Sequence, residues 1–234
     1  MTTYIKENLQ EIKSNISGAA KIAGKSDQEI TLVAVTKYAS IAQIKEIYKL
    51  GITEIGENKV QSALPKIEEL EENKINWHFV GHLQSNKVKY LIDHIYIYQS
   101  LDRISLAKEL NRRADRNNSN VKTLIQINIA GDDNKYGLTV EESEPFIEKI
   151  LENYPRISIN GLMTMIPFFY DPEEGRRYYA RVKDLFDKLR DKFGKEYFQY
   201  LSMGMSHDYY IAIEEGANMV RIGRSLFNTR EEGK

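Results

Sequence analysis

Residues 30–58 read ITLVAVTKYASIAQIKEIYKLGITEIGEN, and they contain one complete repeat of the pattern that decides the fold. A run of small apolar residues comes first, and a segment with apolar residues at helical spacing follows it. Ser40 and Gln43 have the spacing of a capping box, which starts a helix, and Gly51 is typical of a helix end. A second short run, EIGE, completes the repeat. The stretch therefore predicts a strand, a helix and a strand, the unit of a parallel sheet.

The same alternation continues to the C-terminus. Strand-like runs begin near Ile30, Glu54, Ile75, Ile95, Lys122, Ser158, Gln199 and Met219. Many of these runs are apolar on both faces, as expected of parallel strands that are covered on both sides. Eight units satisfy the count of a (β/α)8 TIM barrel, and a doubly wound open sheet is the alternative. We predict an α/β chain in which residues 1–234 form a single barrel domain.

The predicted helices have recognisable first residues. An additional helix precedes the first strand, with apolar residues at helical spacing from Ile5 and a stop at Gly24. Asp102 and Ser206 each precede a helical segment and carry side chains that cap helices. Pro145 favours a helix that begins near residue 143, although a capping-box pattern lies just before it.

Composition excludes several classes of protein. The chain has 33 Lys+Arg and 34 Asp+Glu, and this balance argues against a nucleic-acid binder, which usually has a basic excess. It has no cysteine, which excludes disulfides, thiol nucleophiles and thiolate metal sites; no metal site is expected. No apolar run approaches the roughly 20 residues needed to span a bilayer, and the polar N-terminus does not resemble a signal peptide. We expect a cytoplasmic protein that binds neither nucleic acid nor membrane.

Lys37 is the most informative polar residue, because a barrel places its active site at the carboxyl ends of its strands. Alternation along the first strand puts Val33, Val35 and Lys37 on one face. In a central strand this lysine would be kept from bulk water, and desolvation favours the neutral amine that attacks a carbonyl. From position alone, a lysine that snorkels from a strand end is the more common case.

A phosphate site is predicted after the last two strands. Gly204 and Ser206 follow the seventh strand, and Gly223 follows the eighth. Backbone N–H groups at such turns bind phosphate, and a barrel often places a phosphate there, although ordinary turns also use glycine. Arg221, inside the last strand, needs either an acceptor, an anion or a structural ion pair if it is buried.

Three further residues lie at or near strand ends. Asn58 follows the second run, and Met163 lies in the sixth. His82 follows the third run and is better placed to act than His78, which is expected to be a hydrogen-bonded core residue.

Several segments together resemble one family. They are VAVTK (33–37), IGEN (55–58), WHFVGHLQSNK (77–87), GLMTM (161–165), LSMGMSHD (201–208) and VRIGRSLF (220–227). The set is similar to the pyridoxal-phosphate-binding vitamin B6 homeostasis proteins (YggS/PROSC family), from the first strand to the eighth. The resemblance implies a barrel like the N-terminal domain of alanine racemase, with pyridoxal 5'-phosphate at its mouth.

The resemblance also implies roles for individual residues. Lys37 matches the lysine that forms a Schiff base with the cofactor, and Arg221 matches the arginine that faces the pyridine nitrogen. Ser206 and the backbone around Gly223 match the phosphate-binding positions, and Asn58 matches a contact to the ring side. His82 and Met163 complete the expected cofactor contacts.

The C-terminal motif departs from the family pattern at two positions. Arg224 stands where the family has a small hydroxyl residue, and Asn228 stands where it ends with glycine. The backbone N–H groups survive both changes. We expect Arg224 to strengthen phosphate binding if its side chain turns inward.

The resemblance implies a carrier that binds, buffers and delivers the cofactor, with little or no turnover. An arginine at the ring nitrogen leaves that nitrogen unprotonated, which weakens the cofactor as an electron sink. The expected partners are pyridoxal phosphate, other B6 vitamers and apo-enzymes that receive the cofactor. A monomer is expected, because the chain ends without the second domain of the racemases. The alternatives are an amino-acid racemase that uses Lys37 with His82 or a tyrosine, and an aldolase-like barrel acting on a sugar phosphate.

Overall fold

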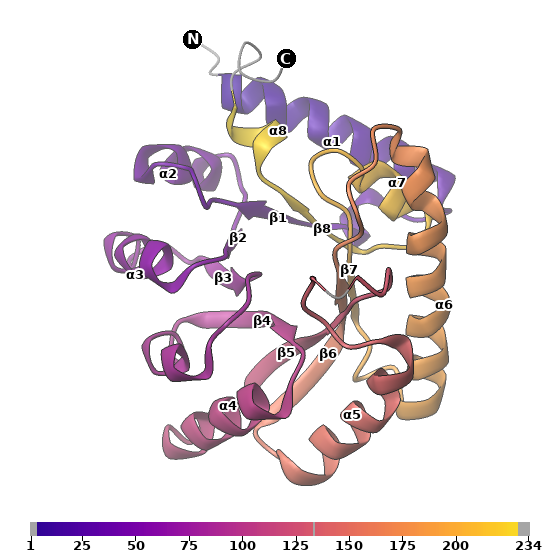
Figure 1. The fold of residues 1–234 in the computed structure, drawn as a ribbon. Helices are drawn as coiled ribbons and strands as arrows, with labels where there is room; N and C mark the ends of the chain where they lie inside the picture. The colour runs from indigo at the N-terminus through magenta and orange to yellow at the C-terminus, as the bar shows by residue number, and fades with distance from the viewer. Residues whose placement is uncertain (1–3, 133, 229–234) are drawn as a thin grey trace.

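Eight parallel strands close into a barrel in the computed structural model, which describes residues 4–132 and 134–228 (Figure 1). The strands are β1 (Thr31–Val35), β2 (Glu54–Glu57), β3 (Asn76–Phe79), β4 (Ile95–Leu101), β5 (Val121–Ile127), β6 (Ile157–Thr164), β7 (Tyr200–Ser202) and β8 (Met219–Ile222). The predicted barrel is confirmed, and the open sheet is wrong, because β1 pairs with β8. Val33 lies opposite Arg221 in that pairing.

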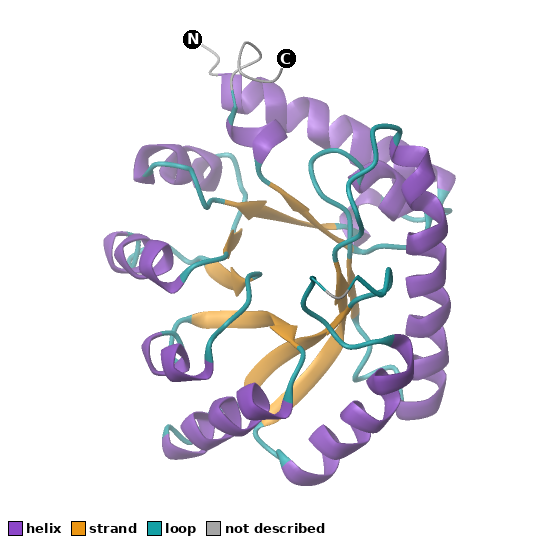
Figure 2. Cartoon of the chain, viewed as in Figure 1, coloured by secondary structure: helices purple, strands orange, loops and turns teal. Residues whose placement is uncertain are grey.

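Helices form the outer layer of the barrel (Figure 2). They are α1 (Tyr4–Ile22), α2 (Ile41–Lys49), α3 (Val60–Glu69), α4 (Ile104–Arg116), α5 (Val140–Asn153), α6 (Arg176–Phe193), α7 (Tyr209–Glu214) and α8 (Arg224–Phe227). Three 3₁₀ segments, η1 (Asp27–Glu29), η2 (Ser85–Tyr90) and η3 (Pro172–Gly175), complete the described elements. None of the helices in the described part of the chain combines the length and the apolar character that a bilayer crossing requires.

The predicted additional helix, α1, fastens the two ends of the described chain together. Its apolar face, including Ile5, Leu9 and Ile12, is buried. On the same helix, Asn8 Nδ2 donates to the carbonyl oxygen of Leu226 at 3.2 Å and to that of Asn228 at 3.1 Å. The segment that carries α8, and with it the predicted phosphate site, is therefore held by α1.

Local signals placed some helix starts correctly and others wrongly. Ser40 and Gln43 form the predicted capping box of α2. The expected start near residue 143 is wrong, because α5 begins at Val140 behind a reciprocal capping box of Thr139 and Glu142. Those two bonds satisfy N–H groups that a helix start leaves free, and they offset the one bond that Pro145 removes.

The two single-residue caps are also wrong. Arg103 is the residue before α4, and Asp102 instead accepts a hydrogen bond from the Arg103 side chain at 2.7 Å. Helix α7 begins only at Tyr209, so it does not start directly after Ser206. The Ser206 hydroxyl is engaged by a different loop, as described below.

Candidate functional site

The barrel brings the predicted site residues to one end. Lys37, Asn58, His82, Ser206 and Gly223 follow the carboxyl ends of β1, β2, β3, β7 and β8, respectively. Because all strands of the barrel are parallel, these ends lie around one mouth.

Lys37 lies on the exposed rim of this mouth. Strand β1 ends at Val35, and the chain then turns, with the Ala39 N–H donating to the Thr36 carbonyl oxygen at 2.9 Å. The Lys37 side chain is exposed, and its Nζ lies 4.9 Å from the centroid of the Tyr38 ring. The expectation that Lys37 is kept from water is wrong, since the alternation of strand faces stops before residue 37. An exposed amine is accessible to a ligand that arrives from solvent.

A buried ion pair fixes the residue just before Lys37. Lys66 Nζ lies 2.6 Å from Glu57 Oε1 and donates to the Thr36 carbonyl oxygen at 2.5 Å. The Thr36 hydroxyl also donates to Glu57 Oε1, at 2.7 Å. The Glu57 side chain is fully buried, and that of Lys66 is 12% exposed. Through Lys66, helix α3 therefore fixes the position of Thr36, the first residue of the turn that carries Lys37. Sequence reasoning missed Lys66, because nothing in its spacing from Thr36 signals this contact.

Arg221 is a buried cation with uncharged partners. Its Nη1 donates to Ser202 Oγ at 2.6 Å, and its Nη2 donates to the Thr164 carbonyl oxygen at 2.7 Å. Burial lowers the pKa of Arg221 to about 10, against the opposing influence of Tyr179 and Asp208, so it stays protonated at neutral pH. Among the residues that the structure describes, no carboxylate forms an ion pair with it, which excludes the structural ion pair considered above. A buried guanidinium of this kind is suited to a ligand that supplies an acceptor.

Two backbone N–H groups, which follow Arg221 closely in the sequence, donate to the same oxygen. The N–H groups of Gly223 and Ser225 donate to Ser206 Oγ at 3.2 Å and 3.3 Å. Such a pair of N–H groups aimed at one oxygen is the donor set that a phosphate oxygen takes. The loops after β7 and β8, where the sequence predicts a phosphate site, thus bring two backbone N–H groups to one oxygen.

Gly204 is required for the path of the loop that carries Ser206. Its φ is +88°, a conformation that side chains rarely adopt. A Cβ there would also lie 2.6 Å from Ala212 Cβ and 2.8 Å from Tyr209 Cα. The missing side chain lets the loop that carries Ser206 lie directly on α7.

Two other predicted contacts lie at the edges of the site. Arg224 is exposed as the first residue of α8, and it makes no ion pair with any residue in the described ranges. The inward turn considered for Arg224 is thus not seen. Met163 is fully buried inside the barrel, in a cluster with Val33 and Leu124, and lies opposite Ser202 in the β6–β7 pairing. Met163 therefore belongs to the apolar interior next to a partner of Arg221.

His82 and Asn58 shape the rim. The His82 ring stacks on Tyr136 with centroids 3.8 Å apart and an interplanar angle of 20°. Burial lowers the pKa of His82, and the nearby Arg103 adds to this effect against Asp102. A Cβ on Gly81 would lie 2.2 Å from the Asn58 carbonyl oxygen, so Asn58 packs against a residue that must be glycine. The loops after β2 and β3 are in direct contact at this point.

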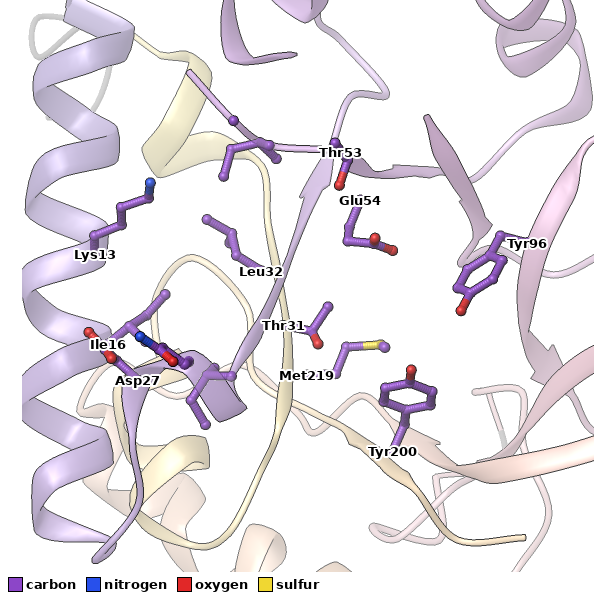
Figure 3. A pocket seen from close by; sticks show the side chains of 14 residues that line it. Lys13, Ile16, Asp27, Thr31, Leu32, Thr53, Glu54, Tyr96, Tyr200 and Met219 are labelled. Atoms are coloured by element: carbon purple, nitrogen blue, oxygen red, sulfur yellow. The ribbon is translucent and has the colours of Figure 1, made fainter. Parts of the chain in front are cut away.

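A cavity of about 560 Å³ lies at the opposite end of the barrel. It is lined by residues at the amino ends of strands, among them Thr31, Glu54, Tyr96, Tyr200 and Met219 (Figure 3). None of the predicted site residues lines it. The described residues also contain no group of three or more His, Cys, Asp or Glu side chains that could hold a metal ion.

Comparisons with known proteins find relatives over nearly the whole chain. The family model of the alanine racemase N-terminal domain matches residues 8–231. A pyridoxal phosphate homeostasis protein of Aquifex aeolicus is 39% identical over 225 residues, covering 96% of this chain and 98% of that protein. One from Haemophilus influenzae is 36% identical over 228 residues, covering 97% and 96%. The solved structure of PipY from Synechococcus elongatus, with PLP bound, has a TM-score of 0.79 and 29% identity, covering 91% of this chain and 100% of PipY.

Proposed function

Because this chain belongs to the alanine racemase N-terminal domain family, and within it to the pyridoxal phosphate homeostasis proteins, we propose that it binds pyridoxal 5'-phosphate at the barrel mouth with Lys37 as the attachment residue. When bound, this cofactor supplies an aldehyde that condenses reversibly with an amine. The cofactor thus needs an amine, a cradle for a phosphate and a partner for a ring nitrogen.

The observation that carries the proposal is Arg221. Its charge is buried, its side chain donates to a hydroxyl and to a carbonyl, and no carboxylate of the described residues lies within ion-pair distance of it. Holding such a cation away from water is costly, and an acceptor supplied by a ligand would offset part of that cost. The ring nitrogen of pyridoxal phosphate is an acceptor that an arginine can meet without giving up its proton.

The remaining residues fit the rest of the cofactor. The N–H groups of Gly223 and Ser225 both donate to the Ser206 hydroxyl oxygen, and these three groups would surround the phosphate. Lys37 offers its amine from a turn whose first residue is tied to α3. Asn58 and His82 line the rim on the side of β2 and β3. One set of groups would thus hold the phosphate, and a separate set would orient the amine.

These features favour a carrier over a catalyst. Arg221 stays protonated, so it donates to the ring nitrogen and does not protonate it, and carbanion chemistry is weak as a result. The exposed Lys37 suits exchange of the cofactor with solvent and with apo-enzymes. Vitamers without an aldehyde would be held only by non-covalent contacts.

The setting of this activity is part of the proposal. We propose a single domain over residues 1–234 that acts as a monomer in the cytoplasm. Apo-enzymes that need pyridoxal phosphate are its proposed recipients. Neither nucleic acid nor membrane is a proposed partner, in keeping with the balanced charge of the chain.

Covalent capture tests the attachment residue. Purified protein is loaded with pyridoxal phosphate, and its visible absorbance is recorded before and after borohydride. We expect the band to be present in the wild type and absent in Lys37→Ala, with unchanged thermal unfolding of the ligand-free proteins. Lys59→Ala, an exposed lysine that follows Asn58, is the matched control and should keep the band. A band that persists in Lys37→Ala would refute the assignment.

A further inference from the structure

A chain of hydrogen bonds crosses the interior of the barrel. Arg221 Nη1 donates to Ser202 Oγ, and that hydroxyl donates to Gln99 Oε1 at 2.7 Å. Gln99 Nε2 lies 2.9 Å from His78 Nδ1, and His78 Nε2 lies 2.6 Å from Glu54 Oε2. The five side chains come from β8, β7, β4, β3 and β2, so the chain links one end of the barrel to the other.

The chemistry of the groups gives this chain a single direction. An arginine can only donate, so Ser202 accepts from Arg221 and must use its one proton on Gln99. The Gln99 amide then offers N–H to His78 Nδ1, which has to be the unprotonated ring nitrogen. Gln99 Nε2 also donates to Met219 Sδ, at 3.3 Å. Each bond in such a chain polarises the next.

This chain of hydrogen bonds ends at the carboxylate of Glu54. The His78 proton lies on Nε2 and is directed at Glu54, which also accepts from Asn76 Nδ2 at 2.6 Å. Burial raises the pKa of Glu54, but the hydrogen bonds from His78 and Asn76 outweigh burial and lower it. Figure 3 shows the Glu54 carboxylate facing Tyr96 and Tyr200, which line the cavity at the end of the barrel opposite the mouth. A buried cation and an ionised carboxylate thus lie at opposite ends of one hydrogen-bond chain.

Two fixed contacts define how the guanidinium of Arg221 lies. Nη2 is held by a backbone carbonyl, which the β6 strand keeps in place. Nη1 is held by a hydroxyl, which is free to rotate unless another group takes its proton. Gln99 takes that proton, and His78 in turn fixes the orientation of the Gln99 amide.

We propose that Ser202 and Gln99 are positioning residues that aim Arg221 at the ring nitrogen of the bound cofactor. The inference rests on the function proposed above, and it adds two residues that touch neither the phosphate cradle nor Lys37. Stability alone would not need them, because replacing paired buried polar groups by apolar groups of similar shape is often nearly neutral.

Two variants and two ligands test the proposal. Ser202→Ala and Gln99→Leu each remove one link beside Arg221. The ligands are pyridoxal phosphate and its 1-deaza analogue, in which a C–H replaces the ring nitrogen while the aldehyde and the phosphate remain. In equilibrium dialysis, we expect both variants to bind pyridoxal phosphate about tenfold more weakly or worse, as for the loss of a hydrogen bond to a charged group. Their affinity for the 1-deaza analogue should equal that of the wild type.

Controls separate positioning from general damage. Thr123→Val also removes one buried hydroxyl bond, to the Ser158 carbonyl oxygen, but it lies outside the chain to Arg221 and should change neither affinity. Ser202→Thr keeps the hydroxyl and should retain binding of pyridoxal phosphate. Thermal unfolding of the ligand-free variants shows that each is folded.

Two results would overturn the proposal. Equal losses for both ligands would mean that the variants damage the fold or the cradle, and unchanged affinity for both would mean that Arg221 needs no help. Failure of the proposed function is distinguishable, because the wild-type protein itself would then not bind pyridoxal phosphate.

Discussion

The ammonium group of Lys66 donates to the carbonyl oxygen of Thr36 at 2.5 Å, one residue before Lys37. Lys66 also neutralises the fully buried Glu57, so one side chain of α3 both balances a charge and holds the turn at the barrel mouth. The position of the Lys37 amine is thereby linked to a buried ion pair outside the predicted cofactor contacts.

Lys66→Met should separate these two tasks. It leaves Glu57 buried without its cation, so we expect the free energy of unfolding to fall by roughly 3 kcal/mol or more in urea titrations of the ligand-free protein. The double variant Glu57→Leu with Lys66→Met should regain most of this stability, because an apolar pair can replace a buried ion pair. Both should capture pyridoxal phosphate at Lys37 more slowly than the wild type. A double variant that captures at the wild-type rate would show that the Thr36 contact does not position Lys37.

Ser206→Ala should weaken the phosphate cradle specifically. The variant loses the acceptor shared by the N–H groups of Gly223 and Ser225, and we expect the ligand-free protein to lose about 1 kcal/mol of stability. Affinity for pyridoxal phosphate should fall, whereas affinity for pyridoxal, which has no phosphate, should not change. Ser225→Ala keeps its backbone N–H and is the matched control. An equal loss for both vitamers would place Ser206 outside the phosphate site.

Little α-proton exchange is expected with amino acids. Arg221 is buried and protonated, so in the proposed complex it leaves the ring nitrogen unprotonated, and the cofactor would stabilise a carbanion poorly. Loaded protein incubated with L-alanine in heavy water should give no α-deuterium signal by NMR. Clear incorporation, lost in Lys37→Ala, would favour the racemase alternative instead.

Glu54 should give the fold an acid-sensitive contribution. Its pKa is lowered in the folded protein by His78 and Asn76 despite burial, so the folded state binds its proton more weakly than the unfolded state does. The contribution is therefore complete above the usual glutamate value of 4.5 and is lost as the pH falls through the lower folded value. Denaturation series from neutral to acidic pH should show a shallower acid loss in Glu54→Gln than in the wild type. Glu71→Gln, on the exposed surface, should retain the wild-type slope.

The architecture could be predicted from the sequence because the signals for strands and helices are local and repeated. The strand-like runs predicted to begin near Glu54 and Ile95 begin at those residues, as β2 and β4, and the Ser40 capping box involves residues three apart. Periodicity and caps depend on near neighbours, so they can be read without knowing the fold. Ordinary strand–helix repetition was enough to predict eight units and an additional N-terminal helix.

Contacts made after closure of the barrel could not be predicted in this way. Ser206 has a side chain suited to capping, yet its partners lie 17 and 19 residues away. The bond between Ser202 and Gln99 joins residues 103 apart. Lys37 follows an apolar strand, but its exposure depends on where the turn after Thr36 begins. Only the closed barrel brings these groups together or separates them from the core.

The most direct measurement is peptide mapping by mass spectrometry after loading with pyridoxal phosphate and reduction with borohydride. We predict one dominant reduced pyridoxyl phosphate adduct, on Lys37, in near-stoichiometric amount at a cofactor concentration just above that of the protein. An adduct spread over several surface lysines, or concentrated on a lysine away from the barrel mouth, would contradict it.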